Sequence, residues 1–211
     1  LNTSNYLTVS AWIKSSCNPY GGNVECRILQ KGSGLQSTTS YVLDLSDVNG
    51  YDATHFCVDQ NNDLDDGCIF STSVISDDNI WHHLVGTWNS TTISIYVDGL
   101  LENSTSYSSA MDNVASPITI GGRDDTNGDW FNGTIDEVQI WNRSLSVNEV
   151  KELYQSSAPY GTQTNFSFSE SNAGDSDVSY DFYRNGTVAA IWRFDEGSGS
   201  YAFDEIGNNN T

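Results

Sequence analysis

The stretch from Ile80 to Leu101 constrains the fold more than any other, because it holds two strand patterns and two turn signals in succession. Between Thr92 and Val97, polar and apolar side chains alternate, as in a strand with one buried and one solvated face. The next pair, Asp98-Gly99, predicts a tight hairpin turn, since both residue types tolerate positive φ. Upstream, Trp81 to Trp88 predicts the preceding strand. Together these signals predict a three-stranded antiparallel meander.

The formal charge of -20 bounds the partners of the chain. With 28 acidic residues against 8 basic ones, the surface repels phosphate backbones, so we expect no nucleic acid partner. The excess predicts a well-solvated surface, and crowded carboxylates also indicate calcium, since a cation relieves their repulsion. No apolar run approaches the roughly 18 residues of a membrane span. The start resembles no signal peptide, so we expect a mature or excised fragment.

The segment WHHLVGTWNSTTISIYVDGLL, from Trp81 to Leu101, resembles the central signature of the laminin G-like, concanavalin A-like jelly-roll domains. Three further stretches fit in the family's order, at Tyr6 to Ser16, Ile28 to Gly34 and Ile118 to Tyr154. They cover about the first 155 residues. The resemblance implies an all-β fold, a two-sheet antiparallel jelly-roll sandwich.

One short helix is expected at the end of this sandwich, where the resembling family also has one. Ser146 and Glu149 have the spacing of a capping box, and Leu145 and Val150 that of a hydrophobic staple. An apolar stripe should follow on one face of the helix, formed by Val147, Val150, Leu153 and Tyr154.

After the helix the chain changes character. We divide it into a jelly-roll domain at 1–155, a linker and β-hairpin resembling part of an immunoglobulin-like domain at 156–190, and a final piece at 191–211. In the middle part, Thr164 to Ser169 and Val178 to Tyr183 alternate as two strands, and Asn185-Gly186 offers a tight turn.

The final piece, from Ile191 to Asn210, resembles the leading strand of the same jelly-roll family, which is not found before Tyr6. Three arrangements are open: the piece folds back onto its own sandwich, is donated to a neighbouring subunit, or begins a further repeat. We favour donation, because a sandwich without this strand leaves backbone groups unpaired, and filling it from a neighbour propagates head to tail.

The four cysteines have spacings of nine and eleven within two pairs, which favours local loop staples over a zinc cluster. We predict Cys17–Cys26 and Cys57–Cys68 among the three connectivities available. Paired cysteines indicate an extracellular or cell-surface location. Eight Asn-x-Ser/Thr sequons point the same way and predict N-glycosylation, at Asn2, Asn89, Asn103, Asn132, Asn142, Asn165, Asn185 and Asn209.

Two groups of oxygen ligands are candidates for calcium. The resemblance implies an ion between the loop after the leading strand and the last long strand, which corresponds to Asp136, Asp204 and the backbone of Gly207, Asn208 and Asn209. The second group alternates as in a calcium loop, at Asp59, Asn61, Asp63 and Asp65. An EF-hand match fails there, because Leu64 and Phe70 occupy the positions of the required glycine and acid.

We expect no enzyme. The resembling hydrolases place several acids along one strand, as E-x-D-x-E or E-x-D-x-x-E, and no such run occurs. Asp136 and Glu137 are adjacent, so regular alternation points them to opposite faces, and His82-His83 diverge in the same way.

These patterns predict a structural or adhesive extracellular glycoprotein module, a subunit of a head-to-tail surface fibre or surface layer assembled by strand complementation. Its partners would be further copies of the chain or other surface proteins. The alternative is a monomeric carbohydrate-binding, lectin-like module of a larger surface protein, with sugars stacking on Trp130, Trp88, Tyr96 or Tyr107.

Overall fold

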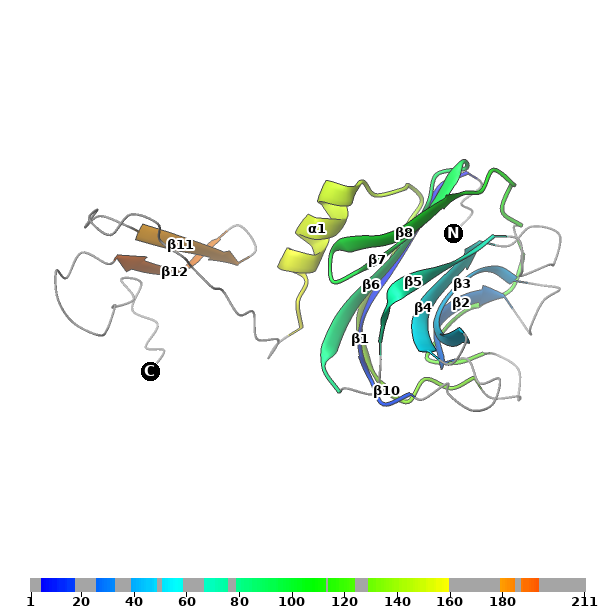
Figure 1. Ribbon diagram of the computed structural model, residues 1–211, viewed down its shortest axis with the longest axis horizontal. Helices are drawn as coiled ribbons and strands as arrows, with labels where there is room; N and C mark the ends of the chain where they lie inside the picture. The colour runs from blue at the N-terminus through cyan, green and yellow to red at the C-terminus, as the bar shows by residue number, and fades with distance from the viewer. Residues whose placement is uncertain are drawn as a thin grey trace. The chain divides into compact units, whose positions relative to one another are not determined.

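The computed structural model describes residues 5–17, 26–32, 39–48, 51–58, 67–75, 79–112, 114–123, 129–159, 179–184 and 187–193. The chain forms two compact units, Leu1–Thr162 and Gln163–Thr211, and each is treated by itself (Figure 1).

The first unit is a sandwich of two five-stranded antiparallel sheets, as predicted (Figure 1). One sheet has the order β10-β1-β6-β7-β8 and the other β5-β4-β3-β2-β9. The strands of the first sheet are β1 (Leu7–Ser15), β6 (Trp81–Trp88), β7 (Thr92–Val97), β8 (Leu100–Ser106) and β10 (Gly133–Trp141). Those of the second are β2 (Cys26–Gly32), β3 (Thr39–Val48), β4 (Tyr51–Val58), β5 (Cys68–Val74) and β9 (Ile118–Ile120).

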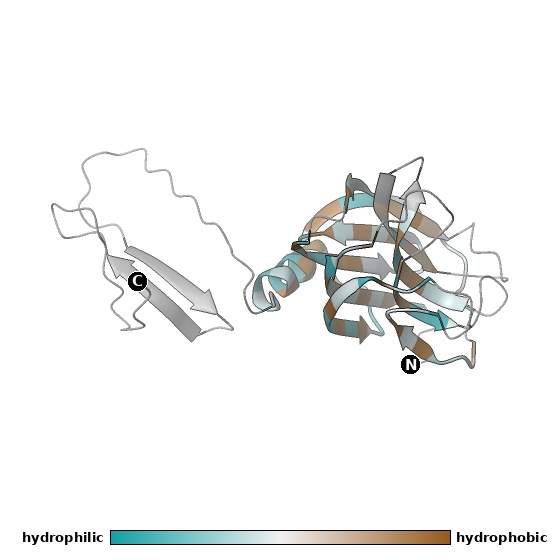
Figure 2. Cartoon of the chain, turned by 90° about the horizontal axis from the view of Figure 1, so that it is seen from below, coloured by the Kyte–Doolittle hydropathy of each residue, from teal (hydrophilic) through white to brown (hydrophobic). Residues whose placement is uncertain are grey.

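The predicted meander is β6, β7 and β8, with β6 and β7 bounded as the sequence indicates. Asp98 and Gly99 both have positive φ, 50° and 76°, which the hairpin turn requires. Apolar side chains from both sheets meet between them, and in Figure 2 hydrophobic and hydrophilic segments alternate along the strands. The core therefore lies between two half-apolar surfaces.

Strand β1 is buried on both faces, unlike a strand with one wet side. Its alternate residues from Leu7 to Ile13 lie in the core between the sheets, and Trp12 on the other face is also buried. Helix α1 (Val147–Ser156) provides this second cover: the ring of Tyr154 stacks on Trp12 with centroids 5.4 Å apart. The indole Nε1 of Trp12 donates to Oγ of Ser157 at 2.9 Å.

The helix begins as predicted. Ser146 is the N-cap, and the reciprocal bonds of a capping box with Glu149 are present. Val150 is buried with Val85, Tyr96 and Leu145, whereas Val147, expected in the apolar stripe, is about half exposed. With ten residues, this helix is not long and apolar enough to cross a membrane.

Both predicted disulfides are present in the sandwich. Cys57 and Cys68 are direct cross-strand partners in β4 and β5, with Cα atoms 4.1 Å apart. Cys17 and Cys26 join the end of β1 to the start of β2, with Cα atoms 6.3 Å apart, and so connect the two sheets. Each bond closes a short loop, which restricts the unfolded chain.

The side of the sandwich formed by β5 and β8 is closed by one carboxylate. Glu102 on β8 accepts hydrogen bonds from the backbone and hydroxyl groups of Thr72 and Ser73 on β5. Burial by itself raises the pKa of Glu102, but these hydrogen bonds outweigh it and lower the pKa below its ordinary value. An ionised Glu102 therefore clamps the edges of the two sheets together.

In the second unit, β11 (Ser179–Arg184) pairs with β12 (Thr187–Arg193) as an antiparallel hairpin around residues 185–186. Strand β12 crosses the predicted boundary at residue 190, so Ile191–Arg193 belong to the hairpin. The expected strand at 164–169 and the remainder of the final piece lie outside the described residues.

His83 lies fully buried between Trp12 and Tyr154, with ring centroids 5.1 and 6.0 Å away. Neither ring nitrogen has a hydrogen-bond partner among the described residues. Burial lowers the pKa of His83 from 6.5 to about 4, although the nearby Asp98 carboxylate acts in the opposite direction. His83 therefore acts as a neutral ring under the helix.

Because the unfolded chain binds this proton first, the free energy of unfolding should fall as the pH drops from about 6.5 towards 4. His83→Phe keeps a flat ring without titrating. We expect the wild type to lose about 2 kcal/mol more than this variant between pH 7.5 and pH 5, in urea unfolding at both values. Equal losses in the two proteins would contradict the buried neutral histidine.

Candidate functional site

A polar network lies on the face of the second sheet that points away from the core. Asp44 sits between Leu43 and Leu45, which face the core, so its side chain lies on the opposite face, yet it is fully buried. It pairs with the Arg27 guanidinium and with His55, whose Nδ1 is 2.9 Å from Oδ1 of Asp44.

Burial alone raises the pKa of the Asp44 carboxyl, but Arg27 and then His55 outweigh it and hold the pKa below its usual range. The network continues to Asp129, which accepts from Nη1 of Arg123 at 2.7 Å and lies 3.9 Å from Nε of Arg27. Every charge in it has an opposite partner, so the network joins β2, β3 and β4 to the segment before β10. Sequence reasoning missed it.

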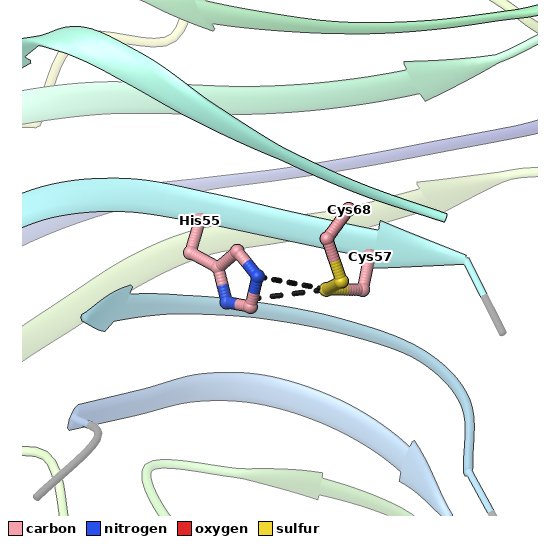
Figure 3. Close-up of side chains that lie close together, drawn as sticks. All are labelled: His55, Cys57 and Cys68. Atoms are coloured by element: carbon pink, nitrogen blue, oxygen red, sulfur yellow. Dashed lines mark hydrogen bonds between the residues drawn. A yellow bond between two sulfur atoms is a disulfide. The ribbon is translucent and has the colours of Figure 1, made fainter. Parts of the chain in front are cut away.

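His55, Cys57 and Cys68 are close enough together to resemble a metal site (Figure 3). The two sulfur atoms are bonded to each other, however, and a disulfide has no thiolate to offer a metal. Nδ1 of His55 already faces Asp44. This cluster is therefore a packed disulfide with a histidine against it. The predicted calcium ligands Asp59, Asn61, Asp63 and Asp65 lie outside the described residues.

The side of the sandwich formed by β9 and β10 differs from the side closed by Glu102. On β9, Ile118 and Ile120 are exposed by 36% and 57%, although their partners in register on β2 include the core residue Leu29. On β10, apolar side chains that pack against the core remain only partly buried, namely Ile135, Val138 and Ile140. We call these five side chains the open apolar edge.

Among the described strands, β10 lies at the edge of its sheet and pairs with β1 alone. Its pairing with β1 is irregular: Ser10 faces Gln139 and Trp12 faces Asp136, so Glu137 and Val138 together oppose Ala11. Glu137 has φ of 47°, as in a bulge. The regular alternation that the sequence argument assumed for Asp136 and Glu137 is interrupted at this pair.

Asp136 is exposed, and its Oδ1 accepts from the backbone N–H of Glu137 at 2.8 Å. Its other oxygen has no partner among the described residues, which suits an anionic ligand for calcium. The remaining ligands predicted for this ion, Asp204, Gly207, Asn208 and Asn209, lie outside the described part of the chain.

Three of the four aromatic residues predicted to stack on sugars are buried, which corrects that part of the prediction. Trp88 is in the core and donates its Nε1 to the carbonyl of Tyr107; Tyr96 lies under the helix, and Tyr107 is packed into the core. Trp88 and Tyr107 belong to the core between the sheets, and Tyr96 lies on the outer face that α1 covers. Trp130 is different, with 63% of its surface exposed.

The ring of Trp130 lies over Gly122, where an added Cβ would come within 2.4 Å of the ring. Gly122 thus leaves room for one face of the indole. Among the described residues, Trp130 is the aromatic side chain with the largest exposed fraction, and it follows the segment that leads from β9 towards β10.

Several known proteins are similar to this chain in sequence. The profile of the concanavalin A-like lectin/glucanases superfamily matches residues 1–151. The rat sushi, von Willebrand factor type A, EGF and pentraxin domain-containing protein 1 is 27% identical over 167 residues, 74% of this chain and 4% of that protein. Mouse usherin is 34% identical over 87 residues, 38% of this chain and 2% of usherin. The chain thus spans a small fraction of these relatives.

Solved structures share the fold. A pentraxin from Limulus polyphemus has a TM-score of 0.54 at 16% identity, covering 72% of this chain and 70% of its own. Domain 4 of the extracellular arabinanase AbnA from Geobacillus stearothermophilus, in complex with arabinotriose, has 0.54 at 16%, covering 74% and 69%. The CBM40 of Ruminococcus gnavus IT-sialidase, bound to α2,3 sialyllactose, has 0.55 at 14%, covering 72% and 84%.

The predicted ion can be tested with the whole chain. If calcium binds the folded state through Asp136, millimolar Ca²⁺ should raise the midpoint of thermal unfolding by several degrees, because ligand binding adds RT ln(1 + [L]/Kd) to stability. Asp136→Asn, which keeps an oxygen to accept from Glu137, should remove most of this rise, as should Asp204→Asn. Asp59→Asn tests the second candidate group and should leave the rise unchanged if the ion is bound through Asp136. An equal rise in Asp136→Asn would place the ion elsewhere.

Proposed function

The chain belongs to the concanavalin A-like lectin/glucanase superfamily, and from that premise we propose that it is a non-enzymatic, extracellular adhesive module whose copies join head to tail by adding a strand at β10. The observation that carries this proposal is the open apolar edge, formed by β9 and β10.

The open apolar edge differs from the opposite side of the sandwich in the hydrogen bonds that join the two sheets. At β5 and β8, the Glu102 carboxylate and the Nδ2 of Asn103 bond across from one sheet to the other. Apolar side chains reach the surface on both sides, but at β9 and β10 no side-chain hydrogen bond joins the two sheets among the described residues, and β10 pairs with β1 alone among the described strands. Exposed isoleucines beside an unpaired strand edge favour association, because an added strand would bury them and pair the backbone groups.

The occupant we propose is the segment 191–210 of a second copy. Its sequence opens with Ile191-Trp192-Arg193-Phe194, in which three of the four residues are apolar. In the second unit, Ile191–Arg193 pair with β11 on one edge of β12, and the other edge has no strand partner among the described residues. A strand with one free edge can add to a second sheet without breaking its own hairpin.

Such a contact is heterologous, because the tail of one copy meets the body of the next, and repetition of it yields a chain of copies. The charge of -20 opposes this association at low ionic strength, since neighbouring copies repel one another. Salt screens that repulsion while leaving the burial of apolar side chains intact. Assembly should therefore strengthen as salt rises, which is opposite to the behaviour of a contact held by ion pairs.

The Asp98 carboxylate has a structural role beside the two histidines of β6. Oδ2 of Asp98 lies 2.8 Å from Nδ1 of His82, and its Oδ1 accepts from the backbone N–H of His83. The same carboxylate thus holds the hairpin turn against β6. A histidine held in this way stabilises a turn.

Carbohydrate binding is a second candidate, and the exposed indole of Trp130 favours it. An aromatic ring with a free face suits the apolar face of a sugar ring. The Geobacillus and Ruminococcus domains of the same fold carry sugars in their structures. In this candidate the module attaches a surface protein to glycans and needs no second copy.

Assembly can be measured by sedimentation velocity and negative-stain microscopy. Deletion of Ile191 to Thr211 should abolish polymers, and Ile120→Lys, which puts a charge on the open apolar edge, should weaken assembly at least tenfold. Leu100→Lys is the matched control, since Leu100 is 65% exposed on the closed side at β8. Polymers in the deletion, or equal losses in both lysine variants, would refute strand addition at this edge.

Sugar binding is tested separately on a glycan array. Trp130→Ala should remove any signal while leaving the midpoint of thermal unfolding and the sedimentation profile unchanged, because most of this side chain is exposed. A signal that survives in Trp130→Ala would exclude this indole as the sugar platform.

A further inference from the structure

We propose that Asn89 is an N-glycosylation acceptor whose amide is already arranged for transfer, and that the attached sugar lies in an adjoining pocket against Tyr6. This inference does not depend on the open apolar edge. It concerns the turn between β6 and β7, where Asn89-Ser90-Thr91 forms a sequon.

The four sequons whose asparagines the structure describes differ in how their side chains are held. Nδ2 of Asn103 donates to the carbonyl of Phe70 at 3.0 Å, and Nδ2 of Asn132 donates to the carbonyl of Ser16 at 3.1 Å. In both, the nitrogen that must attack the sugar lies against a backbone carbonyl of another segment. A transferase would have to pull these amides away from the body first.

Asn89 is held by the other end of its amide. Its Oδ1 accepts from the backbone N–H groups of Thr91 and Thr92, at 3.1 and 2.8 Å, and from the Thr91 hydroxyl at 2.9 Å. Its side chain is exposed, and Nδ2 bonds to none of the described residues. Asn142 is exposed as well, but its Oδ1 receives no hydrogen bond from the described part of the chain.

These bonds favour the chemistry of transfer. Nδ2 attacks C1 of a saccharide carried on a polyisoprenoid pyrophosphate, the C1–O bond breaks, the pyrophosphate leaves with the electron pair, and a base of the transferase takes one amide proton. As that proton leaves, negative charge develops on Oδ1. Donors that already point at Oδ1 stabilise this charge without rearrangement. All of them lie within three residues of Asn89, so the arrangement forms with the hairpin itself.

A shallow, open surface depression of about 540 Å³ adjoins this turn, and Asn89 is one of the residues that line it. Tyr6, about half exposed, provides an aromatic face in it, and the backbone beside Tyr6 is held because Ser90 donates its hydroxyl to the carbonyl of Asn5 at 2.7 Å. Arg143 and Glu149, paired at 2.6 Å, line the pocket and offer a donor and an acceptor.

Such an open depression does not enclose a free small molecule, but an aromatic face beside polar groups suits a sugar ring. An ordinary ligand would have to be captured from solution. A sugar linked to Asn89 is instead tethered beside the pocket at high effective concentration. The chain's own glycan is thus the occupant that the position of Asn89 favours.

Site occupancy tests the first part. The whole chain would be secreted from a eukaryotic cell line and its glycopeptides quantified by mass spectrometry. We expect Asn89 to be occupied at least fivefold more than Asn103 or Asn132. Thr91→Ala should abolish occupancy at Asn89 and Thr91→Ser retain it, while Asn103→Gln leaves the glycosylated mass unchanged. Occupancy of Asn103 or Asn132 equal to that of Asn89, or none at Asn89, would overturn the proposal.

Trimming of the glycan tests the second part. A sugar seated against Tyr6 should be protected from an endoglycosidase that cuts near the asparagine. Tyr6→Ala should therefore raise the trimming rate of the Asn89 glycan severalfold, and Tyr6→Phe, which keeps the ring, should not. Equal rates in all three proteins would show that the sugar does not occupy the pocket.

Discussion

The sandwich depends on burying the apolar faces of two sheets against each other, and the rest of the molecule is arranged around how that burial ends at its margins. Inside, side chains such as Leu43 and Ile95 are fully covered. At one margin an ionised carboxylate, Glu102, bonds across to β5 and closes the gap with polar groups. At the other, no such polar bridge joins β9 to β10 among the described residues, and apolar side chains of both strands reach solvent. The same hydrophobic effect that forms the core therefore leaves one margin able to accept another strand.

Helix α1 buries side chains on the outer face of one sheet. The sheet that contains β1 and β6 carries Trp12 and His83 on its face away from the core. Exposure to water would be unfavourable there for a large indole and an uncharged imidazole. Tyr154 and Ser157 cover both. The cost is an imidazole whose two nitrogens have no hydrogen-bond partner among the described residues, tolerated because a neutral imidazole packs as a ring.

Charge is distributed unevenly between inside and outside. Among the residues whose burial the structure describes, the basic side chains of Arg27, Lys31 and Arg123 are buried, and two of them pair with Asp44 and Asp129. Because these cations hold the second sheet together, the surface is left with the greater part of the acidic excess. Copies of such a module repel one another through solvent, so an apolar contact at one edge would decide where they meet.

Local patterns in the sequence determined the meander, the capped helix and the disulfides, since each depends on residues close in the chain: alternation at Thr92 to Val97, Asp98-Gly99 in the turn, Ser146 with Glu149, and cysteines separated by nine and eleven. The superfamily followed from motifs in order. The sequence could not show that Trp88, Tyr96 and Tyr107 are covered, that β10 bulges at Glu137, or that Asp44 meets Arg27. Those depend on which distant strands lie side by side, and burial on both faces of a sheet is decided by what packs over it rather than by alternation within one strand.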